Sequence, residues 1–121
     1  MSKTHSTPKS FVYATEGLIK ALKDEPNLKI HFAFAVLATM LAFILKLSNI
    51  EFAILALSIG MVIILELINT MLEALVDLVS PEIKPKAKIA KDVSAAAVLV
   101  SAIVSLVIGA LLFLPKIQKF F

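Results

Sequence analysis

The chain has 121 residues, of which 60% are hydrophobic and 17% are charged, and its mean hydropathy is +0.96. Soluble domains are typically about 45–50% apolar and about 25% charged, so this composition indicates a membrane protein. The absence of cysteine excludes disulfide scaffolds and cysteine–metal sites, the three scattered glycines exclude glycine-rich nucleotide loops, and a net charge of +3 is too small and dispersed for a nucleic-acid surface.

The N-terminal part of the chain is predicted to be a polar segment followed by a surface helix. Residues 1–10 are polar and lack the apolar stretch of a signal peptide, so we expect them to be disordered and uncleaved. Between residues 11 and 25, apolar residues recur at helical spacing from Phe11 to Leu22, with charged residues on the other faces. This pattern predicts an amphipathic helix on the membrane surface; the alternative is a helix packed on protein.

Three apolar segments follow, and they are the predicted membrane spans: residues 30–47, 50–78 and 91–114. The first has 18 residues, which as a helix would cover about 27 Å, close to one hydrocarbon thickness. The second crosses only if it continues past Glu66, which places this carboxylate inside the hydrocarbon. The third is expected to end at Pro115. The predicted fold is an all-α integral membrane protein with a surface helix and three transmembrane helices, forming one domain over residues 11–121.

The lysines predict the orientation of the spans. Nine lie in the N-terminal segment and in the loop between the second and third spans, whereas three lie in the first loop and the tail. The first group is Lys3, Lys9, Lys20, Lys23, Lys29, Lys84, Lys86, Lys88 and Lys91, and the second is Lys46, Lys116 and Lys119. The positive-inside rule places the larger group, and with it the N-terminus, in the cytoplasm.

Polar residues on the second span carry the predicted chemistry. They are Glu66, Asn69, Thr70, Glu73 and Asp77. At about 100° per residue their positions fall within an arc of about 100°, so they line one face of a helix. Because a charged side chain at the bilayer centre costs roughly 2.5–3.5 kcal/mol, a row of them indicates a function.

This acidic face leads to a basic loop, which predicts a cation and an anionic ligand. Carboxylates hold Mg²⁺ together with substrate phosphates, and lysine binds phosphate oxygens. A carboxylate deeper in the bilayer is suited to accept a proton from an alcohol at the interface. These parts predict phosphoryl transfer from a cytoplasmic nucleotide to a lipid hydroxyl. Two alternatives remain open from the residues alone: a small proton-coupled membrane transporter, and a structural protein with a buried ion network at Lys91.

Several sequence blocks resemble the prokaryotic diacylglycerol kinase family. Residues 66–77, Glu-Leu-Ile-Asn-Thr-Met-Leu-Glu-Ala-Leu-Val-Asp, are similar to the signature of that family, and residues 90–99, Ala-Lys-Asp-Val-Ser-Ala-Ala-Ala-Val-Leu, are similar to its second block. Residues 11–17 and 25–31 resemble the Gram-positive branch, whose members are mostly undecaprenol kinases. The resemblance implies a homotrimeric kinase of the bacterial inner membrane that uses ATP and Mg²⁺. Its lipid substrate would be undecaprenol or, alternatively, diacylglycerol.

The same resemblance implies roles for individual residues. Glu66 would be the general base, Asn69 would orient it or the γ-phosphate, and Glu25 and Glu73 would hold Mg²⁺. The implied nucleotide-binding residues are Tyr13, Glu25, Glu73, Asp77, Glu82, Lys84, Lys91 and Asp92. Among them, Asp77 would have a supporting role and Glu82 would lie in a loop that closes over the nucleotide. Two residues depart from the family pattern: Lys84 stands where many relatives have a histidine, and Met71 where a small residue is usual.

Overall fold

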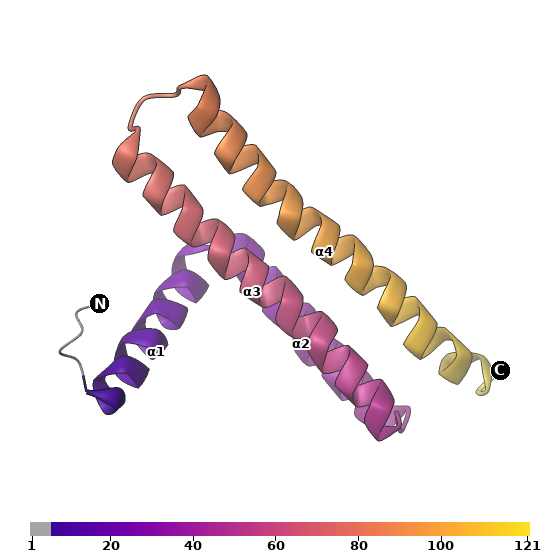
Figure 1. Cartoon of the computed structure of the whole chain (residues 1–121). Coiled ribbons are helices and arrows are strands. Elements are labelled where there is room, and N and C mark those ends of the chain that lie inside the picture. The colour runs from indigo at the N-terminus through magenta and orange to yellow at the C-terminus, as the bar shows by residue number, and fades with distance from the viewer. Residues whose placement is uncertain (1–5) are drawn as a thin grey trace.

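The fold is a set of four helices, seen in a computed structural model that describes residues 6–121. The helices are α1 (Thr7–Asp24), α2 (Pro26–Ile44), α3 (Asn49–Val79) and α4 (Pro85–Gln118). The last three run antiparallel along a common direction, and α1 leaves them at a steep angle (Figure 1). α2, α3 and α4 are each long and apolar enough to cross a membrane. The predicted all-helical architecture, an amphipathic helix followed by three helices of spanning length, is therefore confirmed.

Prolines mark the first turn of three of these helices, and they shift the helix boundaries from those predicted. Proline lacks an N–H, and the first turn of a helix is where that donor has no partner in any case. α1 starts at Thr7, so residues 7–10 are helical rather than disordered, while residues 1–5 lie outside the described part. α2 starts four residues before the predicted span and α4 starts six residues before it. α4 also continues through Pro115, which was expected to end it.

The connection between α2 and α3 is tightly organised. Lys46, two residues after the end of α2, adopts φ 56°, and Leu47 N donates to Ala42 O at 3.1 Å. Ser48 then caps α3, because its Oγ accepts from Glu51 N at 3.2 Å and its own N–H donates to Glu51 Oε1 at 2.9 Å. Buried apolar side chains pack beside this turn: Ala42, Leu47, Leu55 and Leu112. The loop therefore fixes how α2 and α3 pair.

We expect Ser48→Ala to lower the free energy of unfolding by about 1 kcal/mol, because α3 loses the acceptor at its first turn. Thermal unfolding in detergent, followed by circular dichroism, measures this change. Ser10→Ala is the matched control, since the half-buried Ser10 hydroxyl donates to Ser6 O at 3.3 Å and caps no helix start. Equal losses of stability in the two variants would contradict the capping role.

The register of α3 and α4 is visible in two hydrogen bonds between their side chains. Ser94 Oγ donates to Asn69 Oδ1 at 2.6 Å, and Ser58 Oγ donates to Ser105 Oγ at 2.8 Å. Eleven residues separate the two positions on each helix, which is about three helical turns. The same faces of the two helices therefore stay in contact along their length, and Lys116 meets Glu51 at the far end, with Nζ 3.2 Å from Oε1.

Candidate active site

One face of α3 carries the candidate site, and burial decreases along it toward the loop that follows. Glu66 is 1% exposed and Asn69 is 7% exposed. Glu73 is half-buried, and Asp77, one turn further on, is exposed. Because α3 is continuous through all of them, these side chains share one face, as their spacing predicts. The acidic face thus leads from a buried carboxylate to the exposed end of the helix.

Ionisable side chains from three segments lie around Glu66. His31 of α2, Glu25 at the junction of α1 and α2, and Glu73 of α3 all lie within electrostatic range of it. The convergence follows from the helix lengths, since α2 has 19 residues and α3 has 31. The start of α2 therefore lies level with the interior of α3, and α3 extends beyond it (Figure 1). His31 is a neighbour of the site that the sequence argument did not include.

Asn69 connects the acidic face of α3 to α4. Its Oδ1 accepts the hydrogen bond from Ser94 Oγ at 2.6 Å, and its Nδ2 donates to Glu73 Oε1 at 3.4 Å. Ser94 is itself 7% exposed. Ser94 was not among the residues predicted from the sequence, although one signal for it exists: it follows Lys91 by three residues and therefore shares a face of α4 with it.

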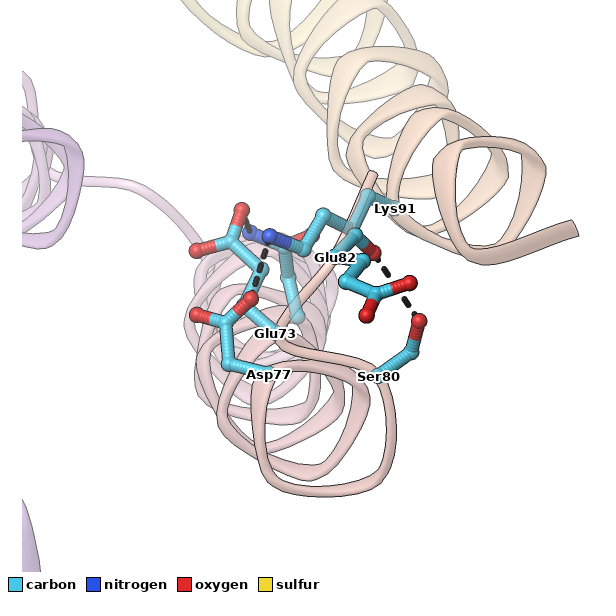
Figure 2. A network of polar contacts seen from close by, with 6 residues as sticks. Glu73, Asp77, Ser80, Glu82 and Lys91 are labelled. Carbon is cyan, nitrogen blue, oxygen red and sulfur yellow. Dashed lines mark hydrogen bonds and ion pairs between the residues drawn. The ribbon is translucent and has the colours of Figure 1, made fainter. Parts of the chain in front are cut away.

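Lys91 reaches from α4 to the exposed end of the acidic face. Figure 2 shows its ammonium beside the Asp77 carboxylate, with Nζ 2.5 Å from Oδ1, and Glu73 lies next to this pair. Lys91 is also within electrostatic range of Glu73. The side chains of Lys91 and Asp77 are 41% and 64% exposed, so the pair contributes at most about 1 kcal/mol to stability. So weak a pair leaves the ammonium available to an anionic ligand.

A cavity of about 250 Å³ lies between the ends of α3 and α4 and the loop that joins them. Four of the predicted nucleotide-binding residues line it: Asp77, Glu82, Lys91 and Asp92. The Asp92 carboxylate is paired with Lys88, Oδ2 to Nζ, at 2.5 Å. Figure 2 shows Glu82 just past the end of α3, where its carbonyl accepts from Ser80 Oγ at 2.9 Å. The cavity therefore presents both ammonium and carboxylate groups.

Other predicted site residues lie away from this cavity. Lys84 lines a neighbouring, more apolar cavity of about 470 Å³ with Leu75 and Val79. Tyr13 lies on the α1 helix, 39% exposed, and Glu25 is half-buried near Glu66. Within the single chain the structure thus forms two groups, one around Glu66 and one around Lys91, which Glu73 and Asn69 connect.

Glu25 and Glu73 are the metal ligands that the resemblance implies. Within residues 6–121, no three His, Asp or Glu side chains gather closely enough to hold a metal ion by themselves. Mg²⁺ is usually held in proteins by one or two carboxylates together with substrate phosphates. Glu25 and Glu73 each lie within electrostatic range of Glu66, and a metal bound by them would need further ligands from a nucleotide.

Comparison with known proteins identifies the family of this chain. The profile of the family described as prokaryotic diacylglycerol kinase matches residues 12–113. Undecaprenol kinase of Bacillus subtilis is 44% identical over 109 residues, which cover 90% of this chain and 89% of that protein. Diacylglycerol kinase of Synechocystis sp. is 43% identical over 109 residues, covering 89% of this chain and 62% of that protein. The chain therefore belongs to the prokaryotic diacylglycerol kinase family, a family of lipid kinases.

Proposed function

We propose that this protein transfers the γ-phosphate of ATP to the hydroxyl of undecaprenol, with Mg²⁺, at the cytoplasmic face of a bacterial inner membrane. Membership of a lipid kinase family favours this reaction over the transporter that the acidic face alone left open. The observation that carries the proposal is the burial of Glu66 in a helix of membrane-spanning length, one turn from Asn69 and two turns from Glu73. A base placed there meets a lipid alcohol rather than bulk water.

In the proposed reaction, Glu66 accepts the proton of the lipid hydroxyl. The hydroxyl oxygen forms a bond to the γ-phosphorus, the bond from that phosphorus to the β–γ bridging oxygen breaks, and ADP leaves with the electron pair. A general base contributes about 10²- to 10⁴-fold to such a rate. Asn69, next to Glu66 on the same face, is positioned to orient the carboxylate or the transferred phosphate.

The nucleotide is proposed to bind at the exposed end of the acidic face. Lys91 supplies a positive charge for phosphate oxygens, and Asp92 and Glu82 line the same cavity. When bound, Mg²⁺ neutralises negative charge on the phosphates, and Glu25 and Glu73 are its proposed protein ligands. Asp77 pairs with Lys91 at the exposed end of α3, which supports its assignment to a secondary role. Tyr13 and Lys84 remain proposed nucleotide contacts on the family resemblance alone.

Undecaprenol is the proposed lipid because the relative named undecaprenol kinase matches this chain over nearly the full length of both proteins. Diacylglycerol is the second candidate, favoured by the name of the Synechocystis relative and of the family itself. Both lipids present a hydroxyl at the membrane interface, so the same base serves either. The choice between the two lipids therefore does not depend on the proposed role of Glu66.

A homotrimer with a cytoplasmic N-terminus is part of the proposal. The helices of the single chain leave many large apolar side chains exposed, among them Phe34, Phe43, Leu57 and Leu106. Such faces are suited to contact lipid tails or neighbouring copies. The lysine distribution supports the orientation, because Lys84 in the loop and Lys86 and Lys88 in the first turn of α4 lie at the same end of α3 as the candidate nucleotide cavity.

A transfer assay tests the proposal directly. Purified protein in mixed micelles receives ATP labelled at the γ-phosphate, with undecaprenol or diacylglycerol as acceptor. We expect label in the lipid extract, faster with undecaprenol, and no transfer after chelation until Mg²⁺ is restored. Faster transfer to diacylglycerol would reassign the substrate, and label in neither lipid would overturn the proposed reaction.

A further inference from the structure

We propose that Ser94 is a positioning residue that sets the orientation of the Asn69 amide toward Glu73. The inference rests on the proposed function, in which Asn69 and Glu73 act on the nucleotide and its metal. It concerns a residue on α4, outside the acidic face of α3. Its starting point is the hydrogen bond from Ser94 Oγ to Asn69 Oδ1, the shortest link between α4 and that face apart from the exposed pair of Lys91 and Asp77.

The chemistry of the three side chains allows one arrangement. An ionised carboxylate only accepts hydrogen bonds, so the side of Asn69 that faces Glu73 must be its NH₂ group, as observed. The carbonyl oxygen of the amide then faces α4 and needs a donor there. Ser94 supplies that donor, since a hydroxyl carries one O–H. A reversed amide would place its oxygen against the oxygens of Glu73.

Burial makes this donor difficult to replace. Ser94 and Asn69 are each 7% exposed. Among the side chains that the structure describes, no buried nitrogen or oxygen lacks a hydrogen-bond partner. Removing the Ser94 hydroxyl would therefore leave the Asn69 carbonyl oxygen buried without one, and only the longer contact with Glu73 would then orient the amide. The contact at 3.4 Å between Asn69 and Glu73 is too long to hold the amide by itself.

The chain offers a matched control for this interaction. Ser58 and Ser105 form a hydrogen bond of 2.8 Å between the same two helices, about three turns from Asn69. Ser58 is buried, as Ser94 is. Ser58→Ala thus removes a side-chain contact between α3 and α4 without touching the candidate site, while Ser105 Oγ keeps its hydrogen bond to the Ser58 carbonyl at 3.3 Å. Any effect that comes only from weaker helix packing should appear in both variants.

The test compares Ser94→Ala with Ser58→Ala and with the unsubstituted chain in the lipid transfer assay. We expect kcat to fall about fivefold in Ser94→Ala, the effect of one hydrogen bond, while the KM for the lipid stays unchanged. Ser58→Ala should keep the kcat of the unsubstituted chain. Thermal unfolding of both variants measures the loss of stability separately from the loss of kcat. Equal kcat values in the two variants would overturn the positioning role.

A double-mutant cycle identifies the residue through which Ser94 acts. In an Asn69→Ala background, Ser94→Ala should change kcat by less than about twofold, because the amide it orients is gone. The same fivefold loss in both backgrounds would overturn the inference. If the unsubstituted chain transfers no phosphate, the proposed function fails and the inference with it. Transfer by the unsubstituted chain without a specific Ser94 effect would overturn the inference alone.

Discussion

Replacing Glu66 with glutamine is expected to lower kcat for lipid phosphorylation at least about a hundredfold, while the chain remains folded. Glutamine keeps the size of the side chain and a hydrogen-bonding oxygen, but it cannot take the proton of the lipid hydroxyl. Glu66 does not line the cavity that contains Lys91, so ATP binding should change little. Initial rates with labelled ATP measure the first effect, and calorimetric titration with Mg²⁺ and ATP measures the second.

The chain offers a control: the same substitution on the same helix, at a glutamate far from the candidate site. Glu51→Gln changes a glutamate in the first turn of α3, where it caps the helix and contacts Lys116, far from the candidate site. We expect this variant to retain the rate of the unsubstituted chain. Equal rates in Glu66→Gln and the unsubstituted chain would remove Glu66 from the mechanism. An equal loss in both variants would indicate that folding, not proton transfer, was affected.

Hydropathy predicted the membrane spans well because the hydrocarbon requires long apolar helices. It predicted their ends less well, because it marks where the lipid begins and not where the helix begins. α4 starts at Pro85 and carries Lys86, Lys88 and Lys91 in its first two turns, so its polar start was assigned to the loop. Pro115 lies three residues before the end of α4, and the helix passes through it although proline removes the hydrogen bond from its own nitrogen.

Part of the candidate site is set by a single helix and was predictable, and part is set by the packing of helices against one another and was not. The periodicity of α3 alone places Glu66, Asn69 and Glu73 on one face, so this part was predictable. The contact of Ser94 with Asn69 depends on the register of α4 against α3, which no local pattern contains. Lys84 lies in an irregular loop without periodicity, and the structure places it beside a different cavity from Lys91.

The register of α2 against α3 likewise could not be predicted from any local sequence pattern. Glu25 and Glu66 are 41 residues apart in the sequence, and the family resemblance supplied the only reason to group them. In the structure they come within electrostatic range because the short turn at Ser48 pairs a short α2 with a longer α3. The length of α2 and the turn after it thus decide that Glu25, a proposed metal ligand, lies near Glu66.

Glu73→Gln is expected to raise the Mg²⁺ concentration for half-maximal transfer at least about tenfold. The substitution removes the charge that attracts the metal but leaves an oxygen that still accepts from Asn69 Nδ2. The substitution therefore tests the loss of the metal ligand without the loss of the hydrogen bond: if only the ligand is lost, kcat recovers at high Mg²⁺.

Rates across a Mg²⁺ titration measure this recovery, with Glu51→Gln as the control. A titration curve that coincides with that of the unsubstituted chain would exclude Glu73 as a ligand, whereas a low kcat at every Mg²⁺ concentration would assign it to the chemical step.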